Sequence, residues 1–180
     1  RLTQVTLAPR EVSVIITGRC NLSCRHCGVS QPGEDLSLKV WEAILDRLAE
    51  ARVLELVISG GEPLFRKDFP EFLRLVLDRP FRFSLNTNAV EISPGIAGAL
   101  ADAGGRLSSV MAGLDGPDAE THDALRGKGV FNRAVAGIRN GLTAGLPLVT
   151  NCTVTRLNWD RVRDSARYAL NEVGVPAAKF

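Results

Sequence analysis

No apolar run in this sequence approaches the roughly twenty residues that a helix needs to cross a bilayer. Residues 1–10 also lack the apolar core of a signal peptide. From these two absences we expect a cytoplasmic protein with no membrane partner.

The sequence also has no excess of charge of one sign. The 22 Lys and Arg residues nearly balance the 20 Asp and Glu residues, and the basic residues form no long run. This balance makes nucleic acid an unexpected partner. The chain of 180 residues, with 45% apolar and 23% charged residues, instead has the composition of one globular domain with a real core.

Cysteine is also scarce, since four residues are too few for a disulfide scaffold. Three of the four, Cys20, Cys24 and Cys27, lie within eight residues of one another. In a cytosolic protein, such a group indicates a metal site before it indicates disulfides. Cys152 stands alone, and we interpret it as a small buried apolar residue.

Strand and helix patterns alternate along the whole chain. Short β-branched or alternating segments predict strands at residues 11–17, 53–59, 81–86, 107–114, 147–154 and 177–180. Apolar residues at helical spacing predict helices over residues 38–48, 69–77, 96–103, 131–142 and 159–173. This alternation favours an α/β fold whose parallel sheet has right-handed crossovers.

The number of strand–helix units limits the architecture. About five and a half units fall short of the eight of a complete (β/α)8 barrel, so the sheet forms a partial barrel or an open α/β fold. The sequence ends inside the sixth expected strand. We therefore expect one domain, residues 1–180, that is incomplete at its C-terminal end.

Several helix ends have recognisable capping residues. Ser37 is expected to cap the first helix, and Pro80 is expected to stop the second. Asn158 is expected to cap the last helix. The predicted buried side of that helix consists of Trp159, Val162, Ala166, Leu170 and Val173.

The cysteine group directly follows the first predicted strand, where parallel α/β proteins place their chemistry. Three thiolates can hold three irons of a cubane cluster and leave the fourth iron open. One alternative is a structural zinc site with His26 as the fourth ligand. Another is an electron-transfer cluster completed by Cys152. The loop favours the open cluster but leaves these alternatives standing.

Further motifs lie at successive strand ends. The Cys-x3-Cys-x2-Cys group is followed by SGGEP at residues 59–63, NTN at 86–88 and LDGP at 114–117. THDALRG follows at residues 121–127 and TVTRLN at 153–158. Together they cover nearly the whole chain, which resembles the radical S-adenosylmethionine superfamily in its core domain.

This resemblance implies a (β/α)6-type barrel and two cofactors. A [4Fe–4S] cluster would be held by Cys20, Cys24 and Cys27. S-adenosylmethionine would chelate the open iron and be cleaved to methionine and a 5′-deoxyadenosyl radical, which abstracts hydrogen from a substrate. A reductase or flavodoxin-type protein would supply the electron.

The resemblance also assigns residues to S-adenosylmethionine. The amino group of S-adenosylmethionine is expected to contact the backbone of Gly60 and Gly61 and the carboxylate of Glu62. His26 is expected to pack near the adenine, and Asn88 is expected to lie near the nucleoside. Asp115 is expected to contact the ribose, and Arg126 the carboxylate or the ribose. His122 and Asp123 are expected to shape the turn that presents Arg126. Each position also has a plain structural interpretation, such as a tight turn at Gly60 and Gly61 or a turn-forming Asp115.

Two positions depart from the family pattern. Gly113 stands where the family often has a hydroxyl residue, which removes one expected ribose contact. Ala89 follows the third-strand motif where glycine is usual, so we expect that turn to differ.

The segment from Gly113 to Gly129 most resembles the branch that matures peptides and builds cofactors (SPASM or twitch type). The first hypothesis is hydrogen abstraction from a peptide or small metabolite. The alternatives are tailoring of a sugar or nucleoside natural product, and an iron–sulfur electron-transfer or binding protein that never cleaves S-adenosylmethionine.

Overall fold

The computed structural model describes residues 9–28 and 33–180, so most of the N-terminal segment in which no signal peptide is expected, residues 1–8, lies outside it. The strands are β1 (Glu11–Ile15), β2 (Glu55–Ser59), β3 (Arg82–Thr87), β4 (Leu107–Gly113), β5 (Leu148–Asn151) and β6 (Ala178–Lys179). The helices are α1 (Leu38–Glu50), α2 (Phe69–Leu77), α3 (Pro94–Ala101), α4 (Ala119–Arg126), α5 (Val130–Thr143) and α6 (Val162–Arg167). None of the described helices is long and apolar enough to span a bilayer.

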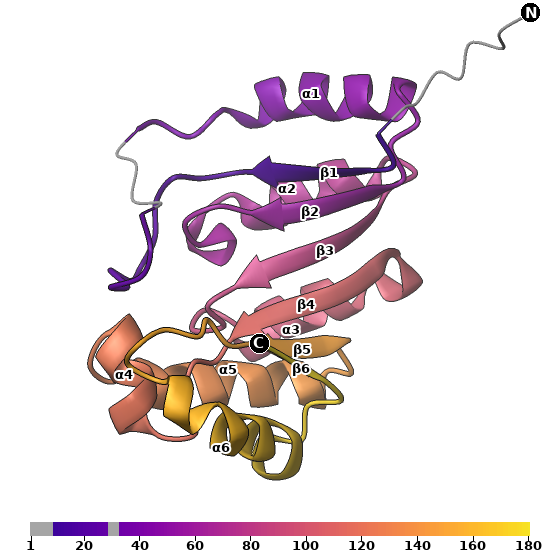
Figure 1. Cartoon of the computed structure of the whole chain (residues 1–180). Helices are drawn as coiled ribbons and strands as arrows, with labels where there is room; N and C mark the ends of the chain where they lie inside the picture. The colour runs from indigo at the N-terminus through magenta and orange to yellow at the C-terminus, as the bar shows by residue number, and fades with distance from the viewer. Residues whose placement is uncertain (1–8, 29–32) are drawn as a thin grey trace, which may run out of the picture.

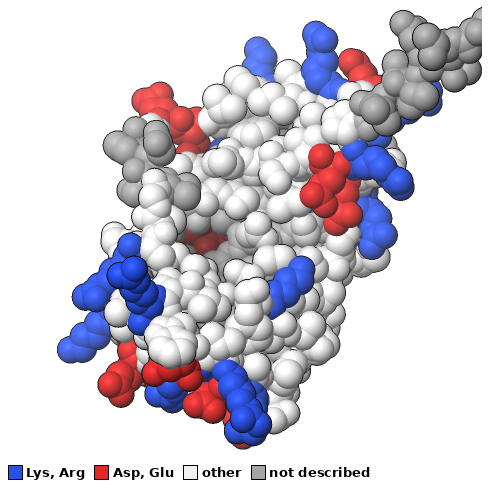
Figure 2. All heavy atoms as spheres, in the orientation of Figure 1, with Lys and Arg blue, Asp and Glu red and all other residues white. Residues whose placement is uncertain are grey.

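The six described strands form one sheet in the order of the chain, and each neighbouring pair is parallel. Strands β1 and β6 are the two edges of the sheet, which confirms the predicted α/β partial barrel. All the strands point the same way, and β1 leads into the segment that carries the cysteine group (Figure 1). In the same orientation, the surface is hollowed beside these carboxyl ends (Figure 2).

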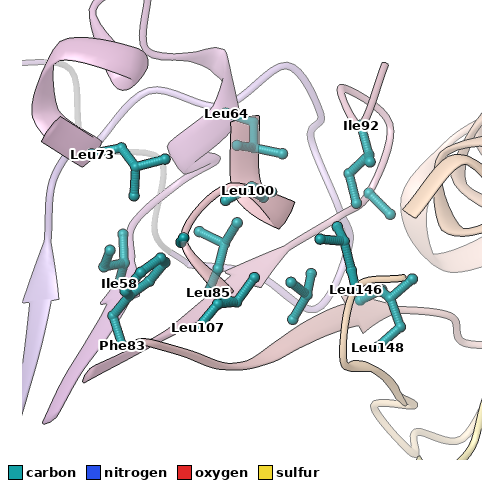
Figure 3. Packing of buried hydrophobic residues seen from close by; sticks show 14 of the residues in the cluster. Ile58, Leu64, Leu73, Phe83, Leu85, Ile92, Leu100, Leu107, Leu146 and Leu148 are labelled. Carbon is teal, nitrogen blue, oxygen red and sulfur yellow. The ribbon is translucent and has the colours of Figure 1, made fainter. Parts of the chain in front are cut away.

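Alternating strand residues build the core on one face of the sheet. In β2, Leu56 and Ile58 are fully buried, whereas the alternate residues Glu55, Val57 and Ser59 are partly exposed. Phe83 and Leu85 repeat this pattern in β3 and pack with apolar residues from the neighbouring helices (Figure 3). Burying each such side chain contributes about 1.5–3 kcal/mol, which fixes the register of the sheet and thereby the position of the strand ends.

The two helices that follow β1 and β2 begin and end close to the predicted residues. The Ser37 side chain accepts a hydrogen bond from the Val40 N–H (3.4 Å), which confirms it as the cap of α1. Helix α2 ends at Leu77, three residues before Pro80, as predicted. Trp41 of α1 and Phe72 of α2 meet edge to face, 5.4 Å apart, and join the helices over the core.

The predicted buried side of the last helix was wrong in part, since Val173 is buried as expected but Trp159 and Leu170 are exposed. The segment starts as a 3-10 turn (Trp159–Arg161), continues as α6 and ends as a π-helix (Tyr168–Val173). Each change alters the number of residues per turn, so the expected apolar stripe does not stay on one face. Trp159 is 68% exposed and Leu170 43% exposed, and the side chains that are buried are Ser165, Ala169 and Val173. Asn158 makes no side-chain cap.

Helix α4 replaces the turn that was expected around His122 and Asp123. The Asp118 side chain accepts a hydrogen bond from the Thr121 N–H (2.9 Å) and starts this helix of eight residues. Glu120 in the first turn is an additional N-terminal signal that could have identified it. The helix carries Arg126 in its last turn, so a rigid element presents this side chain.

Candidate functional site

A cavity of about 250 Å³ lies at the carboxyl ends of the strands. Its walls bring together eight of the predicted site residues: Cys20, Cys24, His26, Cys27, Gly60, Gly61, Asn88 and Arg126. Two more predicted residues, Glu62 and Asp115, are absent from the lining and lie fully buried behind the wall. The motifs that are far apart in sequence therefore share one site.

The loop after β1 carries all three clustered cysteines to the cavity. The Arg25 N–H donates to the Leu125 carbonyl (2.8 Å), which attaches the loop to helix α4. Burial raises the pKa of the Cys20 and Cys24 thiols, and the positive charge of Arg126 acts against this rise at Cys24. Two of the three thiols are therefore half-buried, whereas Cys27 is exposed.

The donor set of this cavity fits an iron–sulfur cluster better than a zinc ion. Within residues 9–28 and 33–180, no three Cys, His, Asp or Glu side chains converge closely enough to hold one ion. A structural zinc site needs such convergence, whereas each thiolate of a cubane binds a different iron. Cys152 is buried and does not line the cavity, so the cavity presents three thiols and leaves room for a further ligand.

Gly60 and Gly61 bring the end of β2 against the start of the cysteine loop. The Gly61 N–H donates to the Thr17 carbonyl (2.8 Å), and the Glu62 N–H donates to the Arg19 carbonyl (2.9 Å). A β-carbon at Gly60 would lie 2.5 Å from the Thr17 carbonyl oxygen, and one at Gly61 would lie 2.6 Å from the Arg19 carbonyl carbon. Both glycines are needed for this approach, which also leaves bare backbone on the cavity wall.

The Glu62 carboxylate is turned away from the cavity and joins β2 to β3. Its Oε1 accepts from the Leu64 N–H (3.1 Å) and the Thr87 hydroxyl (2.7 Å), and its Oε2 accepts from the Asn88 N–H (2.7 Å). Burial raises the pKa of Glu62, and these hydrogen bonds oppose the rise. The structure thus gives Glu62 protein partners on both oxygens in place of the ligand amino group expected from the sequence.

Asn88 lines the cavity at the end of β3, and its amide is engaged within the protein. Its Nδ2 donates to Asn21 Oδ1 (2.7 Å) and towards Cys20 Sγ (3.9 Å), and its Oδ1 accepts from the Val90 N–H (3.0 Å). Ala89, the departure noted above, adopts the left-handed conformation (φ 66°) that glycine takes more readily. The turn therefore keeps a glycine-like shape despite the alanine.

Asp115 and Arg126 form an ion pair behind and beside the cavity. Asp115 Oδ2 accepts from Arg126 Nε (2.5 Å), and its Oδ1 accepts from the Thr153 N–H (2.8 Å). The Asp115 side chain is fully buried and that of Arg126 is 10% exposed. Asp115 therefore holds in place the side chain of Arg126, which lines the cavity.

His122 and Asn158 fix the backbone of Asp115, the acidic partner of this ion pair. The Asp115 N–H donates to His122 Nδ1 (3.1 Å), and Asn158 Nδ2 donates to the Asp115 carbonyl (2.9 Å). Burial, together with the Arg126 charge, lowers the pKa of His122 to about 4, so the ring is neutral at pH 7. The role of Asn158 was missed in the sequence, because its partner lies 43 residues earlier.

Asn86 lines the cavity and belongs to the third-strand motif, whereas the lining residues Met111 and Asn151 were not predicted. Met111 pairs with Asn86 across β4 and β3, and Gly113 with Asn151 across β4 and β5. Strand alternation was the available signal, because these side chains lie on the face opposite the apolar core. They form the part of the wall that comes from β3, β4 and β5.

Residues 14–169 match the Radical SAM superfamily. The chain is 36% identical to the AdoMet-dependent heme synthase of Methanosarcina barkeri over 178 residues, which cover 96% of this chain and 50% of that protein. It is also 36% identical to the mycofactocin maturase MftC of Mycolicibacterium smegmatis over 159 residues, covering 86% of this chain and 40% of that protein. The chain thus spans about half or less of these relatives.

Solved structures share the fold. The crystal structure of Streptococcus suis SuiB matches with a TM-score of 0.81 and 21% identity, covering 94% of this chain and 39% of that one. The structure of anSMEcpe with bound AdoMet matches with a TM-score of 0.81 and 20% identity, covering 94% of this chain and 50% of that one. At this identity the likeness confirms the partial-barrel fold alone.

Proposed function

The chain belongs to the Radical SAM superfamily, and from this premise we propose that it cleaves S-adenosylmethionine reductively at a [4Fe–4S] cluster. The observation that carries the proposal is the shared cavity of about 250 Å³. Three thiols, two glycines and one arginine, from the segments that follow β1, β2 and β4, line it together. We further propose that this radical chemistry abstracts hydrogen from the substrate.

Cys20, Cys24 and Cys27 would hold the cluster, and no fourth cysteine lines the described cavity. When bound, the cluster and S-adenosylmethionine supply one-electron cleavage of the carbon–sulfur bond, giving methionine and a 5′-deoxyadenosyl radical. The protein contributes position and exclusion of water. A reductase or flavodoxin-type protein is the proposed electron donor.

Arg126 is suited to bind the carboxylate of S-adenosylmethionine. Its Nε is occupied by Asp115, which leaves the two outer nitrogens for a ligand in the cavity. A guanidinium fixed in this way offers donors in the planar geometry that a carboxylate accepts. Asp115 would act through Arg126, because its carboxylate accepts the hydrogen bond from the Arg126 Nε.

Backbone groups of Gly60 and Gly61 would bind the amino group, and His26 would pack beside the adenine. The two glycines expose main-chain atoms to the cavity without a β-carbon in front of them. His26, which lies between Cys24 and Cys27 in sequence, lines the same cavity. Glu62 would support the amino-group site from behind by fixing the ends of β2 and β3.

For the reaction class, we propose peptide maturation or cofactor biosynthesis. Among the relatives, one is named a mycofactocin maturase and another an AdoMet-dependent heme synthase. SuiB has been solved bound to the precursor peptide SuiA, and anSMEcpe bound to a peptide. These names support a peptide or a small metabolite as the substrate.

Anaerobic reconstitution of the chain tests the proposal. Iron and sulfide are measured first, and the reduced protein is then incubated with S-adenosylmethionine. We expect about four irons and four sulfides per chain, and methionine and 5′-deoxyadenosine in equal amounts by mass spectrometry. Bound zinc, or a cluster that yields no 5′-deoxyadenosine, would contradict the proposed function.

A further inference from the structure

Cys20 differs from the other two loop cysteines in the hydrogen bonds at its sulfur. Its Sγ accepts from the Leu22 N–H (3.4 Å) and from Asn88 Nδ2 (3.9 Å). Among the residues that the structure describes, Cys24 and Cys27 receive no such bond at sulfur. The three proposed ligands of the cluster are therefore not electrostatically equivalent.

The Asn88 amide is held in one orientation by its surroundings. Its Oδ1 accepts from the Val90 N–H, which directs the Nδ2 group towards the cysteine loop. One hydrogen of that group goes to Asn21 Oδ1 (2.7 Å), and Asn21 Nδ2 in turn donates to Glu91 Oε1 (2.7 Å). The other hydrogen is left for Cys20.

The backbone of Asn88 is fixed as well. Its N–H donates to the buried carboxylate of Glu62, which is anchored by the Thr87 hydroxyl and the Leu64 N–H. Side chain and main chain are thus both constrained, so the dipole of the Asn88 amide points steadily at one thiol. Such preorganised dipoles act on a buried charge more strongly than solvent does.

We propose that Asn88 is a positioning residue that raises the reduction potential of the cluster through its hydrogen bond to Cys20. The inference rests on the proposed function, because it requires that Cys20 bind iron. One-electron reduction adds a negative charge to the cluster, which partly resides on the thiolate sulfurs. A donor at Cys20 stabilises the reduced form more than the oxidised form.

The test is a redox titration of the reconstituted chain, monitored by the electron paramagnetic resonance signal of the reduced cluster. The variants are Asn88→Ala, which removes the donor, and Asn88→Asp, which keeps the acceptor for Val90 and places a negative charge at Cys20. Asn140→Ala is the matched control, since Asn140 donates to the Ile92 carbonyl and does not line the cavity.

Asn88→Ala should lower the ratio of reduced to oxidised cluster at a fixed solution potential by about threefold to tenfold. A tenfold change corresponds to a shift of about 59 mV to lower potential for a one-electron couple. Asn88→Asp should lower the ratio further, and Asn140→Ala should leave it at the wild-type value.

An unchanged potential in Asn88→Ala at wild-type iron content would overturn the inference and leave the proposed function intact. If Asn88→Ala takes up little iron, Asn88→Asp answers the same question, because aspartate has nearly the shape of asparagine. A reduction potential of Asn88→Asp at or above the wild-type value would refute the inference. A wild-type chain that assembles no cluster would instead refute the proposed function.

Discussion

The guanidinium of Arg126 lies against Gly113, in the space that a β-carbon at residue 113 would fill. An ideal β-carbon built there comes within 2.5 Å of Arg126 Cζ. Arg126 cannot simply swing away, because its Nε is bonded to the buried Asp115. The glycine that departs from the family pattern therefore makes room for the arginine, and the missing hydroxyl is replaced by a cation at the same point of the wall.

Gly113→Ala should displace the Arg126 guanidinium from the cavity wall. Forcing a methyl group into occupied space typically costs about 1–3 kcal/mol, and part of that cost should appear as weaker ligand binding. We expect the Kd for S-adenosylmethionine to rise about tenfold or more in the cluster-loaded chain, as measured by isothermal titration calorimetry. Gly98→Ala is the matched control, since nothing lies within 4 Å of a β-carbon there. Unchanged affinity in Gly113→Ala would contradict the packing.

His122 should make the fold sensitive to mild acid. Burial lowers its pKa from 6.5 to about 4, so the native state binds fewer protons than the unfolded state between these values. The free energy of unfolding therefore falls as the pH drops from 6.5 towards 4, by about 2 kcal/mol at pH 5 for this residue. Urea unfolding of the metal-free, reduced protein at pH 7 and pH 5 measures the difference.

His122→Asn separates this effect from other titrating groups. Asparagine keeps an acceptor for the Asp115 N–H but does not titrate. We expect a lower free energy of unfolding at pH 7, because the smaller side chain leaves space beside Phe131, whose ring is 5.7 Å from the His122 ring. The change between pH 7 and pH 5 should shrink by about 2 kcal/mol, and an equally steep profile would contradict the assignment.

The sequence predicted the elements whose cause is local. Ser37 caps α1 because its side chain meets a backbone N–H three residues later, and α2 ends near Pro80 for a similarly local reason. The segment from Trp159 to Val173 was wrong because its turns change from 3-10 to α to π, which no periodic pattern anticipates. Local capping and stop signals could be predicted from the sequence, whereas changes from one helix type to another could not.

At the site, the sequence identified which residues gather but not where their side chains point. The motifs placed Glu62 and Asp115 at strand ends, and both are there. Their carboxylates face partners 25 and 38 residues away in sequence, at Thr87 and Thr153, which only the packed sheet brings close. Side-chain direction depends on these long-range contacts, so the strand-end motif alone could not supply it.

Glu62 should be important for stability although it does not line the cavity. Glu62→Ala leaves three buried donors without an acceptor, on Leu64, Thr87 and Asn88. We expect the free energy of unfolding to fall by about 3 kcal/mol or more, as measured by urea denaturation of the metal-free protein. Glu50→Ala on the exposed surface of α1 is the control, with an expected change within about 0.5 kcal/mol. A similarly small change in Glu62→Ala would refute the role of this carboxylate.

Replacing each of the four cysteines singly by alanine should remove the cluster in three cases and leave it in place in the fourth. Cys20, Cys24 and Cys27 line the cavity, so each replacement should abolish the visible absorption of the reconstituted cluster. Cys152 is buried elsewhere, with Asn158 Nδ2 3.7 Å from its sulfur, and burial raises the pKa of its thiol to about 11. What separates Cys152 from the other three is its place, since this buried thiol does not line the cavity.

Cys152→Ala should therefore keep full iron and sulfide content and yield 5′-deoxyadenosine at the wild-type level, with a loss of about 1 kcal/mol in the free energy of unfolding from the small cavity left behind. Loss of the cluster in Cys152→Ala at wild-type folding would mean that strand β5 supplies a fourth thiolate. The cluster would then have no open iron, and S-adenosylmethionine would have no coordination site on it. Such a chain would be an electron-transfer protein, because a cubane closed by four protein ligands exchanges electrons without binding a substrate.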